Sequence, residues 1–278
     1  MKHTHPIFSK WSLLLATALI LMASCSNSED TQEKPLPELA PITVTQSGEY
    51  TVKELPGDTL STMKGKDISD SGGFKPLFYS LEDGRVIPEE YADTDKWDIA
   101  FTGIYNSSIW ANHGEVIFDN GNKGPGYGSP ARGGIYLVID DAIDAKYYDK
   151  TKRRPSQVPI SKSLFDEAYN NVKTVPIADN QFLSREYLTL DYFLGSGSGY
   201  SFYDFYGSMF PSDPKKAHIV YNLPRTIIIK TAKGNYAKLI IYNTYKGQPN
   251  SPTLDDKAPY LTFKYKILKD GTKDFTKI

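Results

Sequence analysis

The chain has 278 residues, with 32 basic and 33 acidic side chains and a formal net charge of −1. This balance excludes the basic stripe that nucleic-acid-binding proteins normally carry. A single cysteine excludes a disulfide framework, so stability must come from packing and hydrogen bonding. The 20 tyrosines favour β-strands and binding surfaces, because a ring with a polar hydroxyl suits half-buried positions.

The first 24 residues have the pattern of a secretory signal peptide. Lys2 and Lys10 give it a basic start, and the apolar run that follows is too short to span a bilayer of about 30 Å. Small residues precede Cys25, as in a bacterial lipoprotein signal, so we expect cleavage before Cys25 and a lipid on the new terminus. An ordinary secretory signal with an incidental cysteine is the alternative. The acidic segment 26–30 resembles the surface-export tag of Bacteroidetes-type lipoproteins, which predicts a lipid-anchored position outside the outer membrane.

Residues 25–42 contain prolines and acidic residues but few apolar side chains. Such a segment cannot bury enough apolar surface to offset the entropy of ordering, so it is predicted to be a flexible linker behind the lipid anchor. Residues 43–278 remain as one large domain, long enough to bury a core.

Within this domain, short strands alternate with turns rich in Gly, Pro, Asn and Asp. Residues 43–45 and 50–52 are predicted to form a first hairpin, and residues 226–231 and 236–241 form a second around Gly234. The other predicted strands lie at 77–81, 97–101, 115–118, 134–139, 219–221 and 260–268. One helix is predicted over 161–172, where a serine can cap an apolar face. The pattern is typical of an all-β domain, mostly antiparallel, with one or two short helices.

Signatures of catalysis or of a structural metal are weak, so the chain is predicted not to be an enzyme. The glycine-rich run at 195–199 lacks the lysine of a phosphate-binding loop. Only His113 and His218 follow the signal, without a cysteine cluster to complete a zinc site. Acidic clusters at 140–144 and 255–256 lack the alternating spacing of a calcium loop, and are interpreted as solvated turns.

Residues 200–218 combine aromatic rings with groups that bind iron and anions. Tyr203 and Tyr206 are among the rings suited to cover a flat apolar macrocycle, Met209 or His218 is suited to ligate its iron, and the two lysines of the segment can meet propionates. These features make the segment a candidate haem site. Composition alone favours the alternative, an aromatic β core in which Met209 fills space and His218 is an ordinary surface residue.

Three other stretches resemble the HmuY family of haem-binding lipoproteins. The first runs over 78–102 and contains the sequence WDIAF at 97–101; the second covers the hairpin at 226–239; the third is the closing strand at 260–265. The resemblance implies an all-β fold, haem capture outside the cell with host haemoproteins as one source, and delivery to a TonB-dependent outer-membrane receptor.

The resemblance also implies two axial iron ligands, either histidines or methionines, on loops before the terminal hairpin. The second ligand would lie in the loop with Met209 and His218, and Met209 is favoured because His218 precedes a predicted strand. The first is expected within 175–192, which contains neither histidine nor methionine. A six-coordinate iron would then need a tyrosine, such as Tyr187 or Tyr192, or His113 from another loop.

Arg185 is a candidate propionate partner, although a lone arginine in a polar loop is more often solvated. Binding through a single iron ligand also remains open. The alternative function is a lipoprotein of the same fold without haem, which binds a carbohydrate or a protein partner through exposed aromatic side chains.

Overall fold

The computed structural model describes residues 35–64, 73–115, 117, 121, 123–182, 187–188, 191–192 and 199–277. The predicted signal peptide, Cys25 and Arg185 lie outside the described residues. Residues Leu36–Ile278 form one unit. The end of the predicted linker contacts this unit, because Tyr91 Oη donates to the Pro37 carbonyl at 2.8 Å and Leu39 packs against a buried aromatic cluster.

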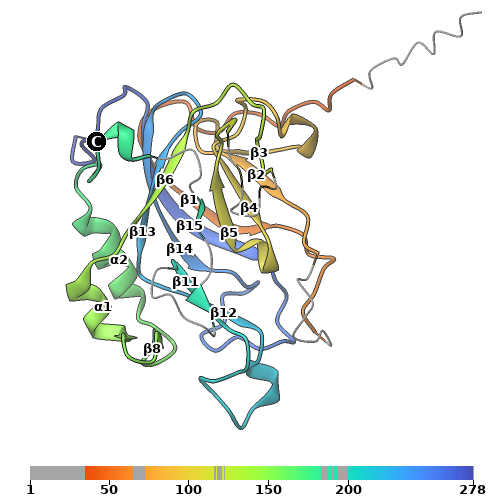
Figure 1. Cartoon of the computed structure of the whole chain (residues 1–278), viewed down its shortest axis with the longest axis vertical. Coiled ribbons are helices and arrows are strands. Elements are labelled where there is room, and N and C mark those ends of the chain that lie inside the picture. The colour runs from red at the N-terminus through yellow and green to blue at the C-terminus, as the bar shows by residue number, and fades with distance from the viewer. Residues whose placement is uncertain are drawn as a thin grey trace, which may run out of the picture. The chain divides into compact units, whose positions relative to one another are not determined.

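Two five-stranded antiparallel sheets face each other over the main core of the described residues (Figure 1). Ile99, Phe101 and Ile109 of one sheet pack there against Ile227 and Phe263 of the other. The first sheet has the order β1 (Gly48–Pro56), β15 (Tyr260–Leu268), β14 (Tyr236–Asn243), β13 (Thr226–Lys230), β6 (Gly134–Val138). The second has the order β3 (Arg85–Ile87), β2 (Leu77–Ser80), β4 (Ile99–Thr102), β5 (Ser108–Ala111), β9 (Tyr187–Leu188).

Two smaller sheets complete the described strands. In one, β11 (Ser201–Asp204) lies between β10 (Asp191–Tyr192) and β12 (Ile219–Asn222), parallel to β10 and antiparallel to β12. The other is the short antiparallel pair β7 (Tyr148–Asp149) and β8 (Arg154–Pro155). The mostly antiparallel all-β fold predicted from the sequence is therefore confirmed.

The described α-helices are α1 (Asp141–Tyr147) and α2 (Lys162–Asn171), and the 3₁₀ turns are η1 (Glu89–Tyr91), η2 (Ile104–Asn106), η3 (Asp179–Gln181) and η4 (Pro214–Lys216). Ser161 caps α2 as predicted, through the Ser163 N–H. At the other end, Lys238 Nζ of β14 donates to the Tyr169 and Val172 carbonyls at 2.8 Å each. Over the described residues, none of the helices has the length and apolar character needed to cross a membrane.

Two sequence predictions about local structure are wrong. Residues 43–45 and 50–52 do not form a hairpin, because β1 pairs along its length with β15 at the other end of the chain. The acidic cluster at 140–144 is not a solvated turn: Asp140 accepts N–H groups as the N-cap of α1, and Asp144 is 2 % exposed. In both cases a distant partner in the fold determines the local structure.

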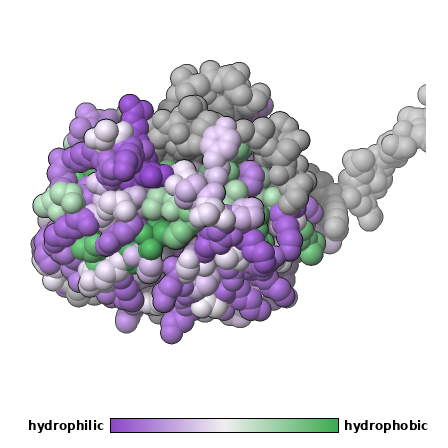
Figure 2. All heavy atoms as spheres, turned by 90° about the horizontal axis from the view of Figure 1, so that it is seen from below, coloured by the Kyte–Doolittle hydropathy of each residue, from purple (hydrophilic) through white to green (hydrophobic). Residues whose placement is uncertain are grey.

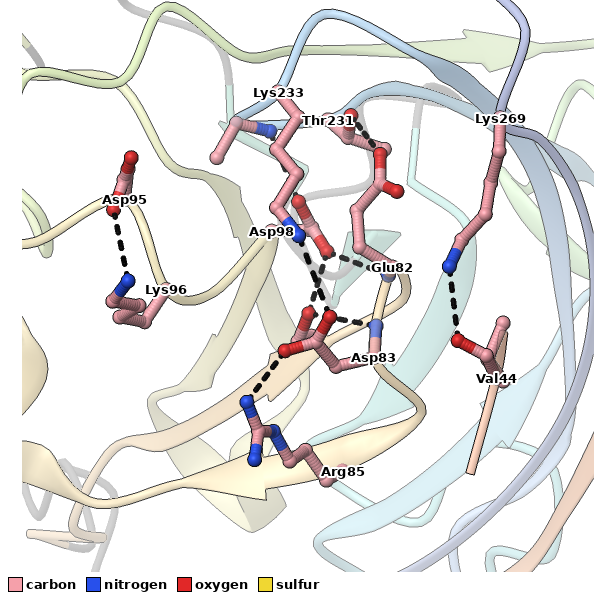
Figure 3. A network of polar contacts seen from close by, with 12 residues as sticks. Val44, Glu82, Asp83, Arg85, Asp95, Lys96, Asp98, Thr231, Lys233 and Lys269 are labelled. Carbon is pink, nitrogen blue, oxygen red and sulfur yellow. Dashed lines mark hydrogen bonds and ion pairs between the residues drawn. The ribbon is translucent and has the colours of Figure 1, made fainter. Parts of the chain in front are cut away.

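A buried polar network joins the start of β4 to the turn between β13 and β14 (Figure 3). The Asp98 carboxylate accepts the N–H groups of Glu82 and Ala232, each at 3.0 Å, and the Ser80 hydroxyl at 3.2 Å. The Glu82 carboxylate in turn accepts the Thr231 hydroxyl at 2.7 Å. Burial raises the pKa of Asp98 to about 6. We refer to these side chains as the Asp98 network.

Candidate functional site

The strands β11 and β12 carry the aromatic segment singled out in the sequence. They pair antiparallel, with Asp204 opposite Ile219, so residues 205–218 form the connection between them. The buried Asp204 carboxylate accepts the N–H groups of Ser208 at 2.6 Å and Met209 at 2.8 Å. These two bonds close a turn and fix the backbone of Met209.

His218 lies directly before β12, as expected, and its environment is defined by two rings. Its Nδ1 is 2.6 Å from the Tyr203 hydroxyl, and its ring centroid is 4.9 Å from that of Phe205. Burial lowers the pKa of His218, so the imidazole is neutral at pH 7. The backbone is left-handed, with φ of 58°, a conformation in which histidine is several-fold enriched over most residues.

The bond to Tyr203 determines what His218 can do chemically. If Nδ1 donates to the phenol oxygen, Nε2 carries a lone pair and can ligate a metal; if the phenol donates, Nε2 carries the proton and cannot. His218 is 9 % exposed, and Tyr203 is 2 % exposed. The pair is therefore chiefly part of the core, and His218 is not the ordinary surface residue of the alternative interpretation.

Met209 is half-buried and packs against the hydrophobic cluster that contains Tyr203 and Phe205. Its thioether is thus neither a fully enclosed core filler nor a fully exposed group. Sulfur of this kind is a soft donor that suits haem iron. Viewed from below Figure 1, the surface is mostly hydrophilic, and a band of hydrophobic residues crosses it (Figure 2).

A hollow of about 350 Å³ lies beside this segment. Its lining residues are Lys152, Arg153, Arg154, Phe202, Asp204, Tyr206 and Ser208. We call it the basic hollow. Tyr206 is 60 % exposed, as a side chain at the mouth of a site would be, whereas Phe202 is buried. The size falls within the range of small-molecule pockets, which is about 300–1,000 Å³.

The turn between β7 and β8 supplies the three cations of the basic hollow. The Asp149 side chain accepts the N–H groups of Thr151 and Lys152 at 3.0 Å each, which shapes the turn. Arg154 Nη1 donates to the Ser208 carbonyl at 2.8 Å and ties the turn to the segment that carries Met209. Sequence reasoning missed this turn, although three consecutive basic residues at 152–154 are a visible signal.

A buried ion pair holds the turn and the start of β11 together. Arg225 Nη2 contacts Asp144 Oδ2 of α1 at 2.5 Å, and Nη1 donates to the Gly199 carbonyl at 2.5 Å. The same guanidinium lies 4.7 Å from the centroid of Tyr148, the first residue of β7. This pair was not predicted from the sequence, because its partners are 81 residues apart.

The two lysines predicted to meet propionates have other partners. Lys216 is buried, and its ammonium group donates to the Ser251 and Pro252 carbonyls at 2.8 Å each. Lys215 Nζ pairs with Asp255 at 2.7 Å. The cations that line the basic hollow together with Tyr206 are instead those of residues 152–154.

The other candidate haem-binding residues either lie away from the segment that carries Met209 or have side chains outside the described part of the structure. His113 follows the C-terminal end of β5, whereas the buried Tyr200, which precedes β11, binds Ser107 at the N-terminal end. His113 therefore lies at the other end of β5 from the segment with Met209. The side chains of Tyr187 and Tyr192, and the whole of Arg185, lie outside the described residues. No cluster of three or more histidine, cysteine or acidic side chains suited to a metal ion occurs in the described part of the chain.

Neither Met209 nor His218 lines the basic hollow. Met209 directly follows Ser208, which does line it. Met209 is therefore adjacent in sequence to a wall of the hollow, whereas the ring of Phe205 lies between His218 and Tyr206.

Two solved structures overlap with most of this chain at low sequence identity. One is a proposed HmuY-like haem-binding protein from Bacteroides vulgatus ATCC 8482, with 13 % identity over 82 % of this chain and 97 % of that chain, and a TM-score of 0.34. The other is a proposed lipoprotein from Bacteroides fragilis NCTC 9343, with 12 % identity, the same coverage and a TM-score of 0.30. TM-scores this low do not establish a shared fold. No protein-family model and no curated protein matches the chain.

Proposed function

We propose that this chain is a lipid-anchored protein of the outer-membrane surface that binds haem and passes it to a TonB-dependent receptor. The protein works by affinity and not by catalysis. It takes haem from the surroundings, host haemoproteins included, and releases it when the receptor offers better ligands.

The observation that carries the proposal is the position of Met209 beside a hollow with cationic and aromatic walls. A haem has an apolar ring system, a metal that accepts a soft donor, and two propionates. Tyr206 provides exposed aromatic surface for the ring, and the cations of residues 152–154 provide partners for the propionates. Met209, one residue beyond the wall, provides the donor.

In this proposal, the residues of the basic hollow would cover one side of a haem, and Met209 would be one axial ligand. When bound, haem would supply an iron centre that can exchange ligands, and the chain would position and shield it. The Asp204 bonds to residues 208 and 209 hold the backbone, so only the Met209 side chain has to move. The second axial ligand is assigned to no described residue.

A visible-absorption titration of residues 26–278 with haemin, oxidised and then reduced, tests the proposal. We expect saturable one-to-one binding with a shifted Soret band. Met209→Ala should abolish the shift, His218→Ala should retain it, and Lys152→Ala with Arg153→Ala should weaken binding at least tenfold. Lys215→Ala is the matched charge control, because Lys215 pairs with Asp255 away from the hollow. Spectra equal to those of free haemin would refute haem binding and favour the carbohydrate or protein partner.

A further inference from the structure

A second and larger pocket, of about 420 Å³, lies on the outer face of the first sheet. Its walls come from β1, β12, β14 and β15, from the start of α2 and from two loops around residues 158–160 and 248–252. Pro159, Pro249 and Pro252 line it and give the two loops restricted backbones. We call it the sheet pocket.

The charge of the sheet pocket is of one sign. Lys53, Lys162 and Lys264 are among its lining residues, whereas no aspartate or glutamate is. Lys162 pairs with Asp166 at 2.7 Å and Lys264 with Glu49 at 3.6 Å, both acids being outside the lining. Lys53 is exposed and has no ion-pair partner among the described residues. The pocket therefore favours an anionic ligand.

Its uncharged polar groups are mainly amides. Gln248 and Asn250 are exposed at the rim, and within the described part of the chain neither side chain has a hydrogen-bond partner. Asn243 accepts the Tyr245 N–H through Oδ1 at 2.7 Å, which leaves its NH₂ group to donate. Amides offer donors and acceptors together, which matches a ligand with several hydroxyl groups, since each hydroxyl also donates and accepts.

Aromatic and aliphatic groups form the rest of the wall. Tyr242 is half-buried, and its ring lies 5.8 Å from that of Phe165. The Tyr242 hydroxyl donates to Asp166 at 2.7 Å, which fixes the ring. A fixed aromatic body with polar groups around it suits a ligand that has both C–H faces and hydroxyl edges.

The sheet pocket lacks the groups that haem iron needs. No methionine, histidine or cysteine is among its lining residues. Tyr245, which lines it, accepts the Val220 N–H at 2.9 Å and has a raised pKa because of burial, so it stays a neutral phenol. The pocket is therefore chemically distinct from the basic hollow.

We infer that the sheet pocket binds an acidic sugar, with the ring hydroxyls on the amides of Asn243, Gln248 and Asn250 and the carboxylate on Lys53. This site uses none of the residues that line the basic hollow. The shared chemistry is a carboxylate on a polyhydroxylated ring, which occurs both in uronate polymers and in sialylated glycans.

Isothermal titration of the full chain in mild detergent tests this inference, with trigalacturonate, 3′-sialyllactose and neutral maltotriose as probes. We expect at least one acidic probe to bind one-to-one, and at least ten times more tightly than maltotriose. Trigalacturonate alone would identify uronates, and sialyllactose alone would identify sialylated glycans; both results support the inference. Binding of neither acidic probe, or equal binding of maltotriose, would overturn it.

Substitutions at the rim test whether the sugar binds in the sheet pocket. Lys53→Gln and Asn250→Ala should each weaken the acidic probe at least fivefold, and both side chains are exposed, so the fold should be retained. Lys215→Gln is the control and should leave affinity unchanged. Equal binding by the rim variants would overturn the assignment, as would displacement of the sugar by haemin. A chain that binds the sugar but not haemin would refute only the haem proposal.

Discussion

The Asp98 network and the Met209 segment lie towards opposite ends of β5, and they differ in how deeply their side chains are buried. Asp98 accepts three hydrogen bonds in a buried site that ties two sheets together (Figure 3). At the other end, Met209 is half-buried and Tyr206 is 60 % exposed. The first region is organised to hold the fold, and the second retains surface that a ligand can cover.

The sequence motifs that resemble the HmuY family lie in the first of these two regions. Asp98 belongs to the WDIAF motif, and Thr231 and Ala232 belong to the hairpin motif, so the two motifs meet in one network. They are needed to join the sheets and do not touch the basic hollow. A resemblance that rests on them therefore predicts architecture much better than it predicts a ligand.

The largest effect is expected from breaking the network. Asp98→Ala leaves the N–H groups of Glu82 and Ala232 and the Ser80 hydroxyl without their acceptor, and should lower the free energy of unfolding by about 3–5 kcal/mol. Urea denaturation followed by tryptophan fluorescence measures the loss. Asp95→Ala is the matched control: this exposed acid lies 4.0 Å from Lys96, and its removal should change stability by about 0.5 kcal/mol or less. Equal losses of unfolding free energy in the two variants would show that the Asp98 network does not stabilise the fold.

The next effect is a pH dependence with an unusual sign. The folded-state pKa of Asp98, about 6, lies above its ordinary value of 3.8, so the folded chain keeps a proton that the unfolded chain has lost. The free energy of unfolding should fall as pH rises from 4 to 6, by about 3 kcal/mol in total. Asp98→Asn should remove this slope.

Below pH 4, two exposed acids give the free energy of unfolding a pH dependence of the opposite sign. Hydrogen bonds from Lys273 and Lys215 lower the pKa values of Asp179 and Asp255, respectively, to about 2. Both contribute stability that rises with pH between 2 and 4, which is opposite to the sign for Asp98. The urea concentration at the unfolding midpoint, measured from pH 2 to 7, should therefore have a maximum near pH 4. A steady rise from pH 2 to 6 would contradict the role of Asp98.

A smaller effect is expected in the Met209 segment. Tyr203→Phe removes the partner of the His218 ring and should destabilise the fold by about 1–2 kcal/mol, since a buried Nδ1 is left without a hydrogen bond. Haemin affinity should stay within twofold, because Met209 is the proposed ligand. A tenfold loss of affinity would instead identify His218 as the ligand, positioned by Tyr203.

The smallest effect on stability is expected at Met209 itself. Met209→Leu preserves volume and apolar character and should change the free energy of unfolding by less than about 1.5 kcal/mol. The same substitution removes the sulfur, so haemin affinity should fall at least tenfold and the Soret band should change. Unchanged spectra with unchanged stability would identify Met209 as a packing residue.

The sequence predicted the strands that depend on local pattern. The hairpin around Gly234 has φ of 84° at this residue, a conformation that glycine adopts freely, and the apolar run of β13 is buried on both faces. Both features are encoded by adjacent residues. The strand at 134–139 and the helix capped by Ser161 were predictable for the same reason.

The parts that the sequence did not predict depend on partners far along the chain. Asp144 has the sequence neighbours of an ordinary surface acid, but in the fold its carboxylate pairs with Arg225 and accepts the Tyr147 hydroxyl. Lys216 follows Lys215 in a short polar segment, so the sequence suggests that it is exposed. In the fold, its ammonium group is instead bound by residues 251 and 252. Candidate site residues chosen by type alone, such as these lysines, are therefore reassigned when tertiary contacts are known.

The pairing of β1 with β15 also determines when the first sheet can be completed during synthesis. Gly48 lies opposite Ile267, so the first described strand can pair only after the last described strand has been synthesised. A pairing this distant in sequence is slow to form, because the intervening loop must close first. Until then β1 is an open edge, which invites pairing with other chains. We therefore expect the pairing of β1 with β15 to be the slow step when the denatured chain refolds.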